Sequence, residues 1–442
     1  MATFQVVKAC GPFQGLPTYF QTSEVSNLTA IVTGANGMSG YHMVRVLAAA
    51  PRRWSRIYCL SRRPPPSNFF ADLGEGAKRV KHICVDFLAD QTEIANQLKR
   101  EIERVDYVCF FSYAQPLQGG SILGMGSAAE ELAKINGTLL RNFLSGLQHS
   151  GLQPKRFLLQ TGAKHYGFHI GPATNPSFES DPRIELEANF YYPQEDALLE
   201  YCNATGVTWN VVRPSYIIGA VRGSALNHMV GLSIYASIQA YLREPLAFPG
   251  DHAAWDRECC QSTAWLNGYF EEWALLTDEA ANEAFNIQDG LPFTWGRFWT
   301  YLADWYGTSW MPPEVDESKY RVRTSRYVET PRGYGPIGVT RSTFSLQEWS
   351  EGSQVQAAWK DLAEKHGLGL DPFTSKNRAQ IFGMTDSAVI GGWALSLSMR
   401  KARSLGFLGT VDSYESAFDT MKDLARLKVV VPLVREEFTS DP

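Results

Sequence analysis

A glycine-rich turn between a strand-like segment and a helix constrains this chain more than any other feature of its sequence. The mostly apolar residues 28–32 lead directly into the run Thr33-Gly34-Ala35-Asn36-Gly37-Met38-Ser39-Gly40. In such a run the first two glycines let the backbone turn tightly and approach a pyrophosphate, and the third lets the helix pack on the strand. The helix N-terminus adds free N–H groups and a favourable dipole. The run therefore predicts a dinucleotide site rather than a purely structural turn, with cofactor-binding residues Gly34, Asn36, Gly37, Met38 and Gly40.

Strand-like runs alternate with helical segments through the first half of the chain. Further apolar runs lie at 56–60, 82–85, 105–111, 156–160 and 207–212. Near-continuous apolar strands separated by helices are typical of a parallel sheet that is covered on both faces. The fold class we expect is α/β, a Rossmann-type doubly wound parallel sheet with a smaller, mostly helical C-terminal substrate lobe.

The order of these segments suggests two interleaved lobes. After about residue 223 the alternation weakens into helices rich in aromatic residues, except for a strand-like return at 283–287 that we expect to join the first sheet. The predicted parts are an N-terminal extension (1–26), which packs on the body or frays, a dinucleotide-binding Rossmann domain (27–225 plus about 255–295) and a substrate-binding lobe (226–254 plus 296–442).

Composition and charge exclude several classes of partner. The 442 residues carry a formal charge of −5, which gives no electrostatic footprint for nucleic acid, and the longest apolar run, 388–399, is far too short to span a bilayer. The seven cysteines form no CxxC pair, which favours a reducing, cytoplasmic setting. No motif for metal hydrolysis, serine hydrolysis or phosphoryl transfer is present, so no metal site is expected. We expect a soluble protein with a small-molecule partner, and the sequence leaves a homodimer open.

The end of the second strand indicates which dinucleotide binds. An NAD site usually places a carboxylate there for the ribose hydroxyl, whereas this strand ends in Ser61-Arg62-Arg63. Guanidinium groups suit a 2′-phosphate, so we predict that NADPH is the cofactor, with two exposed loop arginines as the alternative. Asp86, at the end of the third strand, is a candidate partner for the adenine amino group, although an ordinary strand-end aspartate is nearly as good an explanation.

The catalytic residues are predicted from two separate segments. A short-chain reductase needs a tyrosine near the hydride acceptor and a lysine that lowers the phenol pKa, usually as YxxxK. No such motif is present: Tyr192 stands at the tyrosine position, but Asp196 occupies that of the lysine. Lys164, just after the fifth strand, would lie at the carboxyl end of the sheet, where such folds bind ligands. We therefore expect Lys164 and Tyr192 to be catalytic and cofactor-binding, and Tyr191, on a different helix face, to be a packing residue. Ile218 is also predicted to contact the cofactor.

Four segments resemble one family. They are Leu159-Gln160-Thr161-Gly162-Ala163-Lys164-His165-Tyr166, the stretch 189–196 (NFYYPQED), Arg62-Arg63-Pro64, and 213–219 (RPSYIIG). Together they resemble the progesterone 5β-reductase and iridoid synthase-like (PRISE) enzymes, which are atypical extended short-chain dehydrogenases/reductases. The resemblance implies NADPH-dependent 1,4-reduction of an enone or enal in an apolar small molecule, of the kind found in specialised metabolism. It also implies catalytic roles for Lys164 and for the second tyrosine of NFYY, Tyr192.

Two loops differ from the family pattern and leave other functions open. Residues 167–172 replace a shorter family loop, and 112–116 lack the family's tryptophan and polar residues. A redox-neutral isomerase or cyclase on the same NADP-binding scaffold is therefore an alternative, and a non-catalytic NADP-sensing regulator is a third. We expect an apolar pocket, because the C-terminal lobe offers few charges around Met229, Tyr235, Met384 and Trp393.

Overall fold

The centre of the molecule is a seven-stranded, fully parallel sheet with the strand order β12-β8-β7-β6-β3-β4-β5. The computed structural model describes residues 4–19, 25–115, 127–223 and 227–439. The order reverses beside β3, as in a doubly wound fold, and the late strand at 283–287 joins the sheet as expected. The strands are β3 (Leu28–Thr33), β4 (Trp54–Ser61), β5 (Val80–Cys84), β6 (Tyr107–Phe110), β7 (Arg156–Gln160), β8 (Thr208–Pro214) and β12 (Glu283–Ile287).

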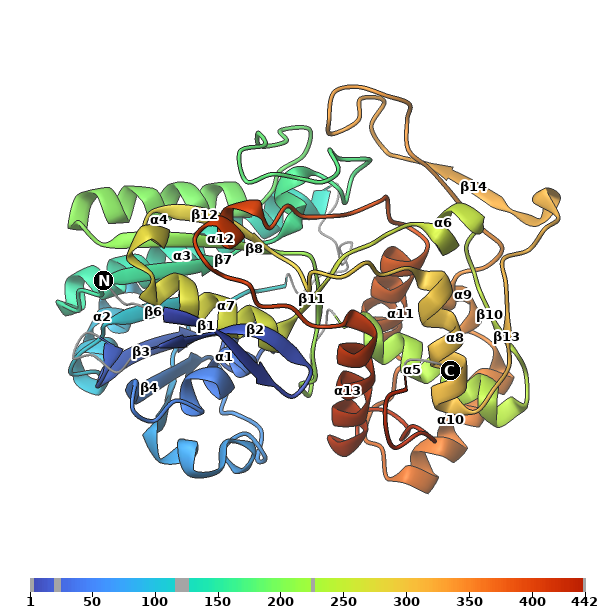
Figure 1. Cartoon of the computed structure of the whole chain (residues 1–442), viewed down its shortest axis with the longest axis horizontal. Coiled ribbons are helices and arrows are strands. Elements are labelled where there is room, and N and C mark those ends of the chain that lie inside the picture. The colour runs from blue at the N-terminus through green and yellow to red at the C-terminus, as the bar shows by residue number, and fades with distance from the viewer. Residues whose placement is uncertain (1–3, 20–24, 116–126, 224–226, 440–442) are drawn as a thin grey trace.

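Helices bury both faces of this sheet (Figure 1). Side chains of a strand alternate between its two faces, so Ala30 and Val32 of β3 pack in one hydrophobic cluster and Ile31 in the other. One cluster includes α1 (Met38–Ala48) and α7 (Ala264–Leu276), and the other includes α2 (Gln91–Glu101), α3 (Ser127–Ser150) and α4 (Tyr191–Thr205). This double burial explains why the strands read as continuous apolar runs.

A mostly helical half follows, drawn at the right of Figure 1. Its core contains the aromatic side chains of α8, and Trp295, Phe298, Trp299 and Trp305 are at most 1% exposed. These residues recur at helical spacing along α8, and their side chains are part of the core. The role of this half in substrate binding stays a prediction. Its helices are α5 (His228–Leu242), α6 (His252–Asp256), α8 (Trp295–Tyr306), α9 (Leu346–Trp349), α10 (Ser353–His366), α11 (Ser375–Val389) and α13 (Ser413–Arg426). The short helix α12 (Arg400–Ser404) packs instead beside β12 of the sheet, in the same hydrophobic cluster as α1 and α7.

Smaller elements complete the chain. The N-terminal strands β1 (Phe4–Cys10) and β2 (Phe13–Tyr19) form a hairpin whose Phe13 and Leu16 are buried against the α1–α7 side of the sheet, so this part packs on the body. No helix in the described segments has the length and apolar character needed to cross a membrane. The remaining strand pairs are β9 (Tyr216–Ile218) with β11 (Gln261–Thr263), β10 (Leu246–Ala247) with β13 (Trp310–Met311), and β14 (Arg321–Thr324) with β15 (Val339–Ser342). Short 3-10 helices lie at η2 (Ala71–Arg79), η3 (Ala163–Tyr166), η4 (Asp278–Ala280) and η5 (Glu317–Lys319).

Candidate active site

A cleft of about 820 Å³ runs across the carboxyl ends of the central strands. Ligands of doubly wound folds bind at this edge, where the strand order reverses. The cleft is lined by the glycine turn after β3, by the ends of β4, β5, β6 and β7, and by residues after β8. Of the site residues predicted from the sequence, those that line it are Gly34, Asn36, Gly37, Met38, Gly40, Ser61, Arg62, Arg63, Asp86 and Lys164.

The glycine turn is shaped for close approach of a ligand. Gly34 has a φ of +61°, and a Cβ there would lie 2.7 Å from the carbonyl oxygen of Phe111, so a side chain is excluded. A Cβ at Gly40 would collide with the backbone of Gly34, which explains the close packing of α1 on β3. The N-cap of α1 is Gly37, which has no side chain to cap the helix, and the first turn contains no acidic residue. The N–H groups of this helix end can therefore bind an anion, which fits the pyrophosphate of a dinucleotide.

The loop after β4 presents two arginines at one end of the cleft. Polar side chains hold its backbone: Asn36 Nδ2 donates to the Arg63 carbonyl oxygen at 2.8 Å, and Ser61 Oγ donates to the same oxygen at 2.8 Å. The side chains of Arg62 and Arg63 are exposed and form no hydrogen bond or ion pair with any residue the structure describes. The loop is thus fixed while both guanidinium groups remain available to a phosphate.

Asp86 lies at this same end of the cleft. One of its carboxylate oxygens accepts a hydrogen bond from the Leu88 N–H at 3.0 Å, and the residue is exposed. The bond accounts for an ordinary turn after β5. A role for Asp86 in adenine binding stays a prediction.

Lys164 lies at the other end of the cleft, in η3 directly after β7. Burial lowers the pKa of its ammonium group to about 8, and the negative charge of Glu187 acts in the opposite direction. Its Nζ lies 5.7 Å from the ring centroid of Phe190, and its carbonyl oxygen accepts a hydrogen bond from Asn189 Nδ2 at 3.0 Å. A buried amine with such a pKa is suited to proton transfer and to binding a sugar hydroxyl near neutral pH.

Tyr191, the first residue of α4, reaches the cleft beside Lys164. Its hydroxyl oxygen lies 2.9 Å from the position that a Cβ on Gly162 would take, so a glycine is needed there to make room for it. That hydroxyl has no hydrogen-bond partner among the residues described here, and burial raises its pKa. The structure thus brings an amine and an unbonded phenol to one cavity, which Gly162 also lines.

The orientations expected for the two tyrosines are reversed. Tyr192 does not line the cleft: its hydroxyl donates to the His165 carbonyl oxygen at 2.7 Å and accepts from the Ile184 N–H at 2.8 Å. Successive residues of a helix point about 100° apart, so only one of the two can face the cleft. Because α4 begins at Tyr191, that residue faces the cleft, and Tyr192 joins two backbone segments behind it.

Ile218 is also displaced from its predicted place. Its neighbour Ile217 lines the cleft, whereas Ile218 is fully buried and lines a separate cavity of about 380 Å³ with His42 and Thr263. Both residues belong to the extended strand β9, in which successive side chains point in opposite directions. The structure thus places Ile217 at the cleft, and a cofactor contact of Ile218 stays a prediction.

A buried charge network reaches His165, the residue that follows Lys164. This network was not predicted from the sequence. Glu195 of α4 accepts a hydrogen bond from Arg213 of β8 at 3.1 Å and one from Arg183 at 3.3 Å, and it lies 3.5 Å from His165 Nδ1. Burial acts to raise the pKa of Glu195, but the nearby His165 and the two arginines lower it overall. A signal was present for three of them, since His165, Glu195 and Arg213 belong to the KHY, NFYYPQED and RPSYIIG segments, whereas Arg183 lies outside these segments. Their periodicity alone did not show that they meet.

Aromatic and apolar side chains surround the rest of this end. The rings of Tyr113 and Phe190 are 5.6 Å apart, and those of Phe168 and Tyr216 are 5.7 Å apart. Met384 of α11 lines the cleft as predicted, whereas Met229 and Tyr235 are buried in the helical core. This composition suits an apolar ligand. Within the described segments no group of three or more histidine, cysteine or acidic side chains could hold a metal ion.

The fold and the cleft together define a class of protein. A glycine turn for pyrophosphate, a lysine and a tyrosine at the far end of the same cleft, and an apolar lining are the parts of a nicotinamide-dependent oxidoreductase. The sequence matches the PRISE-like Rossmann-fold domain family over residues 30–330. The chain belongs to this family.

Similar proteins agree with this assignment. The chain is 30% identical to the "3-oxo-Delta(4,5)-steroid 5-beta-reductase" of Arabidopsis thaliana over 423 residues, which cover 93% of this chain and 95% of the relative. It is 30% identical to the "Short chain dehydrogenase gsfE" of Penicillium aethiopicum, covering 91% and 99%, and 29% identical to the "(S)-8-oxocitronellyl enol synthase CYC2" of Camptotheca acuminata, covering 89% and 91%. Among solved structures, the dTDP-glucose 4,6-dehydratase DesIV of Streptomyces venezuelae shares the fold at 17% identity, with a TM-score of 0.50 and coverage of 65% and 84%.

Proposed function

We propose that this chain is an NADPH-dependent reductase that adds hydride to the conjugated double bond of an enone or enal in an apolar small molecule. The observation that carries the proposal is the pairing of Lys164 and Tyr191 in one cleft with the glycine turn. The steroid 5β-reductase and enol synthase names of its relatives support the same chemistry.

Tyr191 is proposed to stabilise the substrate oxygen. When bound, NADPH would supply a hydride for the β-carbon of the substrate, and negative charge would then develop on the carbonyl oxygen. The Tyr191 hydroxyl, unbonded within the described protein, is a hydrogen-bond donor that can be aimed at this oxygen. The α-carbon of the resulting enolate then takes a proton from water.

Lys164 is proposed to hold the nicotinamide ribose and to favour a polarised Tyr191 hydroxyl. A nearby cation lowers the pKa of a phenol, which opposes the effect of burial on Tyr191. The network around Glu195 fixes the backbone that carries Lys164, so this group is positioned before the substrate binds.

The choice of NADPH over NADH rests on the arginine loop. Arg62 and Arg63 leave their guanidinium groups to the cleft, and no carboxylate follows β4 to bind a free ribose hydroxyl. Both features favour a 2′-phosphate.

A redox-neutral cyclisation or isomerisation is the second candidate. The observation in its favour is the altered loop at 167–172, whose Phe168 lines the cleft. Such a reaction would use the same cleft but consume no NADPH.

One experiment separates these functions. Simple enones and enals are supplied with NADPH or NADH, and cofactor absorbance and product mass are followed together. Loss of absorbance that matches a product two mass units heavier supports reduction. Product formation without cofactor oxidation supports the alternative. Turnover that survives unchanged in Tyr191→Phe would contradict the proposed site.

A further inference from the structure

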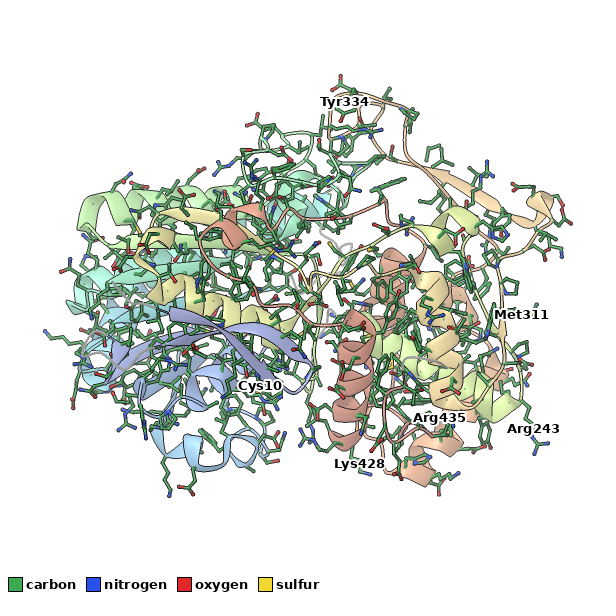
Figure 2. The ribbon with its side chains drawn as sticks, in the orientation of Figure 1. Cys10, Arg243, Met311, Tyr334, Lys428 and Arg435 are labelled. Atoms are coloured by element: carbon green, nitrogen blue, oxygen red, sulfur yellow. The ribbon has the colours of Figure 1, made fainter. Side chains whose placement is uncertain are left out.

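A cavity of about 380 Å³, here called the second cavity, lies between the two halves of the molecule and apart from the cleft. Its wall is formed by the turn of the β1–β2 hairpin, by α1 and α7 on the sheet side, and by α13 on the helical side. Figure 1 shows the hairpin turn pointing toward α13, and Cys10, labelled in Figure 2, lies at this turn. Ile217 lines the cleft and Ile218 lines the second cavity, so strand β9 passes between the two spaces.

Arg45 of α1 lines the second cavity with its hydrogen-bonding capacity unused. Its side chain is 16% exposed, and its guanidinium carbon lies 3.9 Å from the ring centroid of Trp265. A carboxylate oxygen of Asp423 is 3.9 Å from Nη1, which is too long for a hydrogen bond. The guanidinium group forms no hydrogen bond with any residue that the structure describes. Buried polar groups are normally satisfied, so the N–H groups of Arg45 indicate an acceptor from outside the chain.

His42, one turn earlier on α1, offers a free acceptor in the same cavity. The residue is 4% exposed, and its Nδ1 lies 2.8 Å from the Met38 carbonyl oxygen. Because that oxygen can only accept, Nδ1 carries the proton of the ring. Burial, together with the charge of Arg45, lowers the pKa of His42 to about 4, so near neutral pH the ring is uncharged and Nε2 has a lone pair. Among the described residues Nε2 has no hydrogen-bond partner.

The rest of the wall combines an apolar surface with one more polar group. Phe13 and Ile218 supply apolar side chains. Thr420 of α13 is 7% exposed, and its hydroxyl has no hydrogen-bond partner in the part of the chain that the structure describes. A guanidinium donor, an imidazole acceptor and a hydroxyl thus line one cavity beside apolar groups, which is the usual composition of a small-molecule site.

Charged side chains of both signs line the second cavity. Arg45 and Lys422 are positive, and Asp419 and Asp423 are negative. Asp423 accepts a hydrogen bond from Arg426 Nε at 3.2 Å, and partial burial raises the pKa of Asp419. Both effects weaken the repulsion of an anion by these acids, whereas Arg45 has no hydrogen-bonded carboxylate. The balance favours one negative group on the ligand, placed at Arg45.

We propose that the second cavity is a ligand site for a small apolar carboxylic acid that also carries a hydroxyl group. The carboxylate accepts from the N–H groups of Arg45, whose planar fork matches two carboxylate oxygens. The ligand hydroxyl donates to Nε2 of His42 and accepts from Thr420, and the apolar body packs on Phe13. This site lies outside the cleft and does not depend on enone reduction there.

Cys10 provides a local readout of binding, because it is an exposed thiol that lines the second cavity. The probe is 3-phenyllactate, which has a carboxylate, a hydroxyl and an apolar ring. Alkylation of Cys10 by iodoacetamide is followed in the full chain by peptide mass spectrometry. Millimolar 3-phenyllactate should slow the alkylation of Cys10 about threefold or more. Cys84, which is exposed but outside this cavity, is the internal control and should react at an unchanged rate.

Variants and related probes assign the effect to individual groups. Arg45→Met should raise the probe concentration needed for protection about tenfold or more, because the charged contact is lost. Thr420→Val should raise it by a smaller factor. Arg62→Met, which changes an exposed arginine of the cleft, is the matched control and should leave protection unchanged. The uncharged 3-phenyllactamide should protect Cys10 least, and 3-phenylpropanoate, which lacks the hydroxyl, should be intermediate.

Three results would overturn this assignment. Cys10 could react at the same rate with and without 3-phenyllactate, Arg45→Met could be protected as well as the parent protein, or Arg62→Met could lose protection, which would place the probe in the cleft. If Arg45→Met does not fold, Thr420→Val carries the comparison, because it removes one hydroxyl and keeps the shape of the side chain. Protection of Thr420→Val equal to that of the parent would then contradict the site.

Discussion

The two ends of the cleft are built from different kinds of groups. At the arginine end, contacts are offered by backbone N–H groups of the glycine turn and by the exposed guanidinium groups of Arg62 and Arg63. At the lysine end, Lys164 and Tyr191 are half-buried, and their pKa values are shifted by that burial. Exposed charges and backbone dipoles bind a ligand without changing their own protonation, whereas buried titratable groups can exchange protons near neutral pH. The first end is therefore suited to binding and the second to reaction.

Removing the Tyr191 hydroxyl should have the largest effect. We expect it to lower the rate of the reaction and to leave ligand binding at the arginine end unchanged. We expect Tyr191→Phe to lower kcat by about 10²–10³, or about 2.7–4 kcal/mol, because a donor to the developing oxyanion is lost. Binding of 2′,5′-ADP, which probes only the arginine end, should be unchanged. Steady-state kinetics and calorimetry check the two halves of this prediction. A kcat within twofold of the parent would show that Tyr191 takes no part.

Raising the pH should have the second-largest effect. We expect it to change the lysine end of the cleft and not the arginine end. The folded pKa of Lys164 is about 8, so its ammonium form is present below that pH and is lost as the pH rises through it. The rate should therefore fall about tenfold for each unit above about pH 8. Binding of 2′,5′-ADP should stay constant from pH 7 to 9, because arginines remain charged. A rate that is flat to pH 10 would contradict the assigned role of Lys164.

Substitutions of Arg62 and Arg63 test the arginine end of the cleft. Arg62→Ala or Arg63→Ala should weaken 2′,5′-ADP binding about tenfold, or about 1.4 kcal/mol, and reduce a preference of tenfold or more for NADPH over NADH. The rate with NADH should change little, because that cofactor lacks the 2′-phosphate. Rising salt should weaken the NADPH preference, since these charges are exposed. Equal use of both cofactors by the parent protein would rule out this function of the arginines.

The smallest effect on rate is expected for Tyr192→Phe. This change leaves the cleft lining intact but breaks the bonds to His165 and Ile184, so the free energy of unfolding should fall by about 1–3 kcal/mol. Urea denaturation compared with kcat measures both effects. If Tyr192→Phe instead loses as much activity as Tyr191→Phe while its stability is unchanged, the tyrosine assignment must be exchanged.

The two ends also differ in how far the sequence predicts them. The glycine turn is a local motif whose function lies in the backbone, so Gly34, Gly37 and Gly40 could be placed in the cleft from spacing alone. At the lysine end, the direction of a side chain depends on the residue at which a helix or strand begins. The structure places Tyr191 rather than Tyr192, and Ile217 rather than Ile218, at the cleft, because a shift of one residue turns a side chain to another face.

Contacts between residues far apart in the chain could not be predicted from the sequence either. Glu187 and Tyr327 are separated by 140 residues, and Glu195 and Arg213 meet only because α4 packs beside β8. A single sequence gives no signal for such pairs. The fold itself was predictable, because alternating strands and helices restrict the sheet to a few arrangements.

The most direct test of the account is a crystal structure of the protein with NADP⁺ bound. We expect the pyrophosphate at the N-terminus of α1, the 2′-phosphate on Arg62 and Arg63, the Lys164 ammonium on the nicotinamide ribose, and the Tyr191 hydroxyl facing the nicotinamide ring. A structure with Tyr191 turned into the protein and Tyr192 beside the nicotinamide, or with the dinucleotide outside the glycine turn, would contradict it.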